Sequence, residues 1–151
     1  MKLNLFRFLA LLAGVAGVLF WGSTAYAQSV KIRAQIPFDF VLGDRVYPAG
    51  EYVVETLTED SHSLLVRNQA AKSSVLTPAY RTASAEPAKQ TVLAFHRLGN
   101  TYFLYQAKIA DSPSGCQFLR SHMENKMVKA ETMGKVETKA ETVIVAANIL
   151  R

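Results

Sequence analysis

The chain has 151 residues, of which 17 are basic, 12 are acidic and one is cysteine. The basic residues are spread along the sequence without a dense cluster, which argues against a nucleic-acid-binding surface. Because Cys116 is the single cysteine, an intramolecular disulfide is excluded and the fold has to be stabilised by its core.

The N-terminus has the pattern of a secretory signal peptide. Lys2 and Arg7 form a basic start, residues 8–22 are an uncharged apolar run, and the tripeptide Ala-Tyr-Ala ending at Ala27 fits a signal-peptidase site. The alternative is an uncleaved membrane anchor, which is disfavoured because a helical span needs about 20 apolar residues.

This pattern predicts a signal peptide at residues 1–27 and a single β-rich domain at residues 28–151. Without Lys2 and Arg7 the chain keeps 15 basic and 12 acidic residues, a mild net charge of +3. We expect an exported protein that is periplasmic, extracellular or associated with an outer membrane.

The predicted domain opens with period-two alternation. From Val30 to Phe40 every second residue is apolar, which is typical of a half-buried β-strand. Pro37 has no N–H to donate, so we expect this strand to lie at a sheet edge or to be bulged there.

Two turns follow the first strand. Gly43-Asp44 predicts a two-residue type II′ hairpin, because glycine readily takes a positive φ, and this register sets Phe40 opposite Tyr47. Pro48 and Gly50 predict a type I turn into the next strand. Further strands are expected at residues 51–58, 63–68 and 73–83, and residues 84–90 are expected to form a loop.

The clearest hairpin is centred on Gly99-Asn100. Both of its faces are largely apolar, so we expect it to be covered on both sides. The predicted register pairs Leu98 with Thr101, His96 with Phe103, and Ala94 with Tyr105.

The segment after residue 110 changes to helical spacing, with Leu119, Met123, Met127 and Ala130 in phase. Ser114 and Gln117 fit a capping box that starts this helix, and Gly134 is a plausible C-cap. We expect the lysines and glutamates from Glu124 to Glu141 to form a solvated helical face.

The sequence ETVIVAANIL at the C-terminus favours a last strand that closes against the first one. The fold class predicted from all these elements is mainly β. We expect a small antiparallel barrel or sandwich of about seven strands with one amphipathic helix.

The histidines provide no metal-ligand spacing. His62, His96 and His122 lack the i, i+4 arrangement of a helical metal site, and we predict no metal and no cofactor. His96 is the best single candidate for a functional histidine, although a histidine beside aromatic residues more often has a structural role.

The aromatic residues on the predicted strands have two interpretations. They can line an apolar pocket, as in barrels that carry small ligands, or they can fill the core of a domain without disulfides. The second interpretation is favoured. The candidate ligand-binding residues are His96, Phe103, Tyr105, Phe40 and Tyr47.

Cys116 is the remaining candidate for chemistry. A helix start at residues 114–116 would present backbone N–H groups that lower a thiol pKa, which makes a nucleophile paired with His96 or His122 conceivable. A buried, inert cysteine is the favoured alternative, and no catalytic residues are predicted.

Two segments carry a resemblance to a known family. After the signal peptide, IPFDFVLGDRVYPAGEYVV (residues 36–54) and VLAFHRLGNTYFLYQ (residues 92–106) resemble a family of small secreted bacterial proteins of unknown function. The resemblance spans most of the predicted domain. It implies an envelope location and no particular activity, substrate or catalytic residue.

We therefore expect an exported, non-enzymatic β-domain with a binding or structural role in the bacterial cell envelope. One alternative is a small barrel that binds an apolar ligand, and another is an enzyme that depends on Cys116. The expected partner is an envelope component or a small apolar molecule, with membrane contact only through the signal peptide during export. The oligomeric state is left open.

Overall fold

The computed structural model describes residues 29–57, 63–133 and 141–150. The predicted signal peptide, His62 and the predicted C-cap at Gly134 lie outside the described residues. The described part holds ten strands and one helix: β1 (Lys31–Ile36), β2 (Phe40–Leu42), β3 (Arg45–Tyr47), β4 (Gly50–Thr56), β5 (Ser63–Asn68), β6 (Ser73–Ala83), β7 (Val92–Leu98), β8 (Thr101–Lys108), β9 (Ser114–Phe118), α2 (His122–Thr132) and β10 (Glu141–Leu150).

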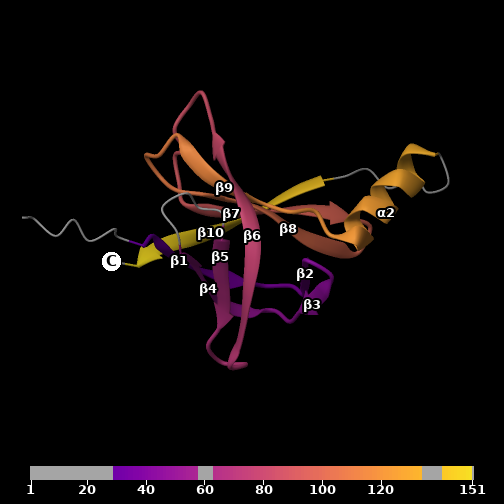
Figure 1. Ribbon diagram of the computed structural model, residues 1–151, viewed down its shortest axis with the longest axis horizontal. Coiled ribbons are helices and arrows are strands. Elements are labelled where there is room, and N and C mark those ends of the chain that lie inside the picture. Colours follow the sequence, from indigo (N-terminus) through magenta and orange to yellow (C-terminus); the bar gives the residue numbers. More distant parts are fainter. Residues whose placement is uncertain (1–28, 58–62, 134–140, 151) are drawn as a thin grey trace, which may run out of the picture.

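Eight of the described strands close into an antiparallel barrel (Figure 1). Their order around the wall is β8, β7, β10, β1, β4, β5, β6 and β9, and β9 pairs again with β8. The predicted small antiparallel barrel is confirmed. The predicted closure of the last strand against the first is confirmed as well, because β10 pairs with β1 from Lys31↔Leu150 to Ala34↔Ala147.

The β2–β3 hairpin adds to the wall beside β8. Strand β2 runs parallel to the start of β8, with Phe40 opposite Tyr102, while β9 pairs with the end of β8. The predicted pairing of Phe40 with Tyr47 is confirmed. Gly43 has φ +60° and Asp44 is not among the residues with positive φ, as a type II′ turn requires.

The first predicted strand is divided by Pro37. Strand β1 ends at Ile36, and the chain bends before β2 begins at Phe40. Of the two alternatives expected for this strand, an edge position or a bulge at Pro37, the edge position is wrong, because β1 lies between β10 and β4 and pairs with both. Pro37 falls in the bend, so its missing N–H removes no ladder hydrogen bond.

The barrel interior is filled by apolar side chains. Ile32, Ala34 and Ile36 alternate inward from β1 and are at most 3% exposed. Aromatic rings fill the space between the strands, and the Phe40 ring meets the Tyr52 ring edge-on at 5.0 Å between centroids. The largest side chains of this cluster that are less than 2% exposed are Tyr52, Phe40, Phe95, Phe118, Ile36, Leu64 and Leu93.

Two hydrogen bonds hold the turn that leads into β4. The Ala49 N–H donates to Oδ1 of Asp39 over 2.8 Å, and the Tyr52 hydroxyl donates to the Pro48 carbonyl over 2.8 Å. Gly50 follows with φ +157°, and a Cβ at this position would lie 3.1 Å from Nδ2 of Asn68. The segment from Asp39 to Tyr52 therefore has a structural role.

The β7–β8 hairpin contains a β-bulge. The predicted pairs Leu98↔Thr101 and His96↔Phe103 are confirmed. The predicted pair Ala94–Tyr105 is wrong, because the register shifts and Ala94 lies opposite Gln106. Tyr105 is thus the extra residue on its strand, and the shift lets its ring reach His96.

The predicted helix start at Ser114 is also wrong, because residues 114–118 form β9. Cys116 and Phe118 alternate into the core cluster, and the strand fills the gap between β6 and β8. A Cβ on Gly115 would lie 2.8 Å from the Ala107 carbonyl oxygen, so glycine permits the close approach of β8. Leu119 lies outside the helix.

Helix α2 starts at His122 and is capped from two directions. Ser121 Oγ accepts a hydrogen bond from the Glu124 N–H over 2.9 Å, which is the serine half of a capping box. Asp44, in the β2–β3 turn, accepts from the His122 N–H over 2.9 Å.

Within the described residues, no helix has the length and apolar character needed to cross a membrane.

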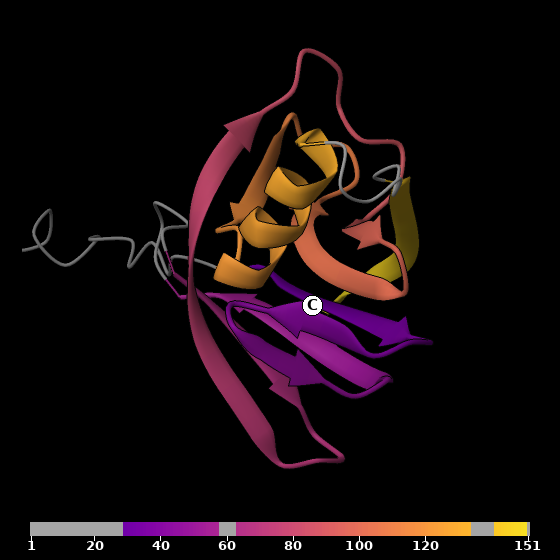
Figure 2. The same cartoon turned by 90° about the vertical axis from the view of Figure 1, so that its right-hand side faces the viewer.

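Helix α2 lies next to the β2–β3 hairpin, in front of the strands in Figure 2. A second apolar cluster lies between them, formed by Val41, Leu98 and Phe103 with Met127 and Val128 of the helix. The predicted cover of the β7–β8 hairpin on both faces is confirmed, with the barrel core on one side and α2 on the other.

We expect alanine at Gly50 to destabilise the protein more than alanine at Gly43. Gly50→Ala combines an unfavourable φ with a tight contact to Asn68 and should cost about 1–3 kcal/mol. Gly43→Ala meets open space and should cost about 1 kcal/mol through φ alone. Urea unfolding measures both costs, with the exposed Ser74→Ala as control, and unchanged midpoints for both glycine variants would contradict the expected result.

Burial raises the pKa of Tyr52 above its ordinary value of 10.0, while a side-chain hydrogen bond with Asn68 acts in the opposite direction. The folded chain therefore keeps this proton where the unfolded chain loses it. The resulting stability is complete below about pH 10 and is lost as the pH rises further.

In urea unfolding between about pH 8 and pH 11, Tyr52→Phe should show a shallower loss of stability above pH 10 than the parent protein. It should also cost about 1 kcal/mol at neutral pH, because the hydrogen bond to Pro48 is removed. Parallel pH profiles for the two proteins would show that Tyr52 does not contribute this dependence.

Candidate functional site

The five residues predicted to line a ligand site lie in three separate places. Phe40 stacks on Tyr47 at 5.7 Å between centroids and belongs to the barrel core, with Tyr47 packed against it. Phe103 belongs to the outer cluster beneath α2. His96 stacks on Tyr105 at 3.9 Å between centroids, and this pair meets the helix rather than the core.

A buried side-chain contact links His96 to the helix. Nδ1 of His96 lies 2.8 Å from Oε1 of Glu124, and the two side chains are 18% and 4% exposed. Nε of Arg120 lies 3.7 Å from the same carboxylate oxygen. The prediction that Glu124 belongs to a solvated face is wrong, because Glu124 lies one helical turn before Met127 and Val128, which pack on the barrel.

The His96–Glu124 contact orients an imidazole in a way familiar from hydrolases. A proton on Nδ1 would be donated to the carboxylate, which fixes the ring and leaves Nε2 as an acceptor. The structure does not bring the predicted nucleophile to this ring, because Cys116 is in the barrel core and is 7% exposed. The contact positions α2 on the barrel wall.

Neither of the other predicted partners completes a chemical site in the described structure. His122 is an exposed residue at the start of α2, bonded through its backbone to Asp44. Cys116 lies in a strand, so the predicted helix start beside it is absent. Within residues 29–57, 63–133 and 141–150, no group of three His, Cys, Asp or Glu side chains has a metal-binding arrangement.

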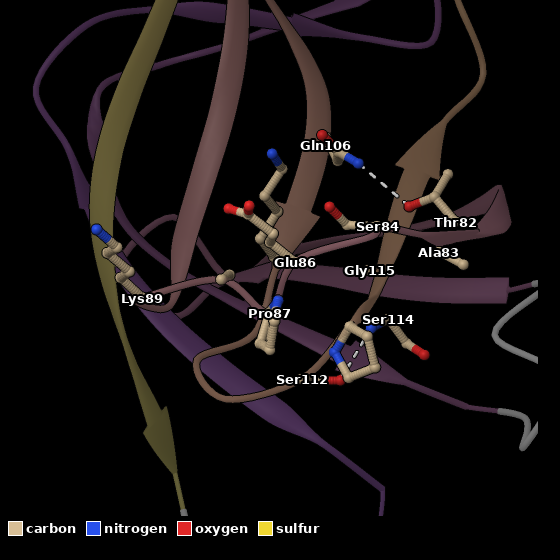
Figure 3. A pocket seen from close by; sticks show the side chains of 13 residues that line it. Thr82, Ala83, Ser84, Glu86, Pro87, Lys89, Gln106, Ser112, Ser114 and Gly115 are labelled. Atoms are coloured by element: carbon tan, nitrogen blue, oxygen red, sulfur yellow. Dashed lines mark hydrogen bonds between the residues drawn. The ribbon is translucent and has the colours of Figure 1, made fainter.

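The second candidate site is a cavity of about 350 Å³ at one end of the barrel (Figure 3). It lies where the ends of β6, β8 and β9 meet the loops at residues 84–91 and 109–113. The lining residues are Thr82, Ala83, Ser84, Glu86, Pro87, Ala88, Lys89, Gln106, Lys108, Ser112, Pro113, Ser114 and Gly115.

Backbone hydrogen bonds join the two loops around this cavity. The Ser84 N–H donates to the Pro113 carbonyl over 2.7 Å, and the Asp111 N–H donates to the Ala88 carbonyl over 2.9 Å. Asp111 adopts φ +58°, which turns the second loop back toward the first. The cavity is thus part of the folded structure and requires no rearrangement of these loops to form.

Side chains that line the cavity also form hydrogen bonds. Nε2 of Gln106 donates to Oγ1 of Thr82 over 3.1 Å, the dashed contact in Figure 3. Oγ of Ser112 accepts from the Ser114 N–H over 3.1 Å. In the same view the side chains of Thr82, Ser84 and Gln106 lie close together at the upper right, and those of Ser112 and Ser114 lie below them.

The sequence predicts a loop at residues 84–90 and does not indicate this cavity. Its hydroxyl and amide groups come from three strands and two loops, and they have no common spacing in the chain. A prediction would need the pairing of β9 with both β6 and β8, which the helical interpretation of Ser114 excludes.

Comparison of the chain with protein-family models, with curated proteins and with solved structures gave no match.

We expect the His96–Glu124 pair to contribute to the docking of α2. His96→Ala leaves a carboxylate that is 4% exposed without its closest partner, and Glu124→Ala removes that carboxylate. A double-mutant cycle measured by urea unfolding should give a coupling of about 1–2 kcal/mol.

The exposed pair Arg97–Glu141, at 3.6 Å and with exposures of 42% and 65%, is the matched control. Its coupling should stay below about 0.5 kcal/mol, because water screens both charges. Equal couplings for the two pairs would mean that burial adds nothing to the His96–Glu124 contact.

Proposed function

We propose that the protein is an exported, non-enzymatic β-barrel domain that binds a component of the bacterial cell envelope. The signal-peptide pattern at residues 1–27 and the resemblance to small secreted bacterial proteins motivate the location. The observation that carries the binding role is the contrast between a barrel interior filled by side chains and a preformed polar cavity at the barrel end.

The filled interior argues against the alternative of an internal apolar ligand. Barrels that carry such ligands keep room between their strands, whereas Phe40, Tyr52 and Phe95 occupy the centre here and are at most 1% exposed. An apolar ligand would have to displace these rings from a packed core, and close packing makes such displacement costly.

The second alternative is an enzyme that depends on Cys116. A reactive thiolate needs solvent access and a base within hydrogen-bonding reach. Cys116 packs into the barrel core, while His96 contacts Tyr105 and Glu124 under α2. This separation supports the non-enzymatic proposal.

Native mass spectrometry of the protein, expressed as the full chain and purified from the envelope fraction, tests the proposal. We expect a polypeptide that begins at Gln28, and a solvent extract free of fatty acids and isoprenoids. A stoichiometric lipid in that extract would instead favour the apolar-ligand alternative, and a chain retained in the cytoplasm with residues 1–27 intact would contradict export.

The binding role is tested by capture from solubilised envelope extracts. The immobilised protein should retain one envelope component reproducibly, and the same protein unfolded in urea should not retain it. Equal retention on folded and unfolded protein, or no retention at all, would contradict the proposal.

A further inference from the structure

Hydrogen-bonding side chains form a large part of the lining of the cavity at the barrel end. Four lining residues carry hydroxyl groups: Thr82, Ser84, Ser112 and Ser114. A hydroxyl group has one donor and two acceptor positions, so each retains hydrogen-bonding capacity beyond the single contact made by Thr82 or Ser112. Such a lining suits a ligand that is itself rich in hydroxyl groups.

The charges of the lining favour an anionic ligand. Lys89 and Lys108 contribute two ammonium groups and Glu86 contributes one carboxylate, so the lining has a formal charge of +1. All three side chains are exposed, so water screens them and a single negative charge on the ligand is attracted weakly. Ammonium donors also form charge-assisted hydrogen bonds with a carboxylate or a phosphate.

The size and stiffness of the cavity favour one small molecule. A volume of about 350 Å³ lies at the lower end of the range for small-ligand sites, which begins at roughly 300 Å³. Pro87 and Pro113 restrict the backbone, and Gly115 lies in a paired strand, so ordering these walls costs little on binding.

We propose that this cavity binds a small polyhydroxylated anion, of the chemical class of a sugar acid. The inference rests on the proposed envelope-binding function and deepens it by naming the site and the chemistry of the ligand. Hydroxyl and amide groups of the walls pair with the ligand's hydroxyl groups, and Lys108 at the end of β8 pairs with its negative charge.

Titration with three pyranoses of different charge tests the class of ligand. Glucuronate, glucose and glucosamine carry a negative, a zero and a positive charge, and the backbone amide signals of the full-length protein report binding by NMR. We expect glucuronate to bind most tightly and glucosamine least, with shifts concentrated at residues 82–89 and 106–115. Equal affinities, a reversed order or no shifts in these segments would overturn the proposal.

Two variants locate the site. Lys108→Gln should weaken glucuronate binding about three-fold to five-fold while leaving glucose binding unchanged, because one partly solvated charge is lost. Ser84→Trp should fill the cavity and abolish both. The controls are Lys129→Gln on α2 and Ser74→Trp near the start of β6, which should bind glucuronate like the parent.

The same variants separate this inference from the proposed function. If the Ser84→Trp protein unfolds at the same urea concentration as the parent and still captures the envelope component, the cavity is not the binding site and the inference fails while the function stands. If the parent protein binds glucuronate but captures nothing from the envelope, the proposed function fails instead.

Discussion

Strand β9 pairs with β6 along one edge and with β8 along the other, and these two ladders close the barrel. Without β9 both neighbouring edges would present unpaired backbone groups to water. The closure requires β8 to approach within a distance that leaves no room for a side chain at residue 115, where the chain has glycine. A five-residue strand therefore determines whether the other seven strands enclose a core.

The same strand determines what lies outside the core. Its N-terminal end, at Ser114 and Gly115, forms part of the cavity wall. Its C-terminal end is Phe118, after which the chain continues to α2. Because α2 starts four residues later, its position on the β7–β8 hairpin follows from where β9 ends. The contacts of His96 with Glu124 and of Asp44 with the His122 N–H then hold the helix in that position.

Short-range patterns in the sequence predict the strands and turns whose structure depends on residues close together in the chain. Alternation over residues 30–40 identifies inward-facing positions such as Ile32 and Ile36, and glycine at residues 43 and 99 identifies both hairpin turns. The pairings Phe40↔Tyr47 and His96↔Phe103 follow from those turns, since a two-residue loop fixes the register near it. Farther from the turn, the bulge at Tyr105 shifts the register, and the residues around Tyr105 do not predict this bulge.

The parts that could not be predicted depend on contacts between distant segments. Ser114 with Gln117 and Ser121 with Glu124 both fit a capping box, and the choice between them is made by the open edges of β6 and β8, which accept residues 114–118 as a strand. Glu124 has the spacing of a surface residue until His96, 28 positions earlier in the chain, is placed beside it. The cavity has the same origin, because its lining is assembled by the closure.

Aromatic side chains fill the interior of the barrel. Aromatic side chains that a ligand-carrying barrel would direct at its ligand contact one another here, as Phe40 does with Tyr47, Tyr52 and Phe95. Changes in the core are thus constrained by packing, whereas residues 84–91 and 109–113 can vary in side chain while the backbone bonds between them persist. Side chains at the barrel end can therefore change without disturbing the closure by β9, and this separation is compatible with the binding role proposed above.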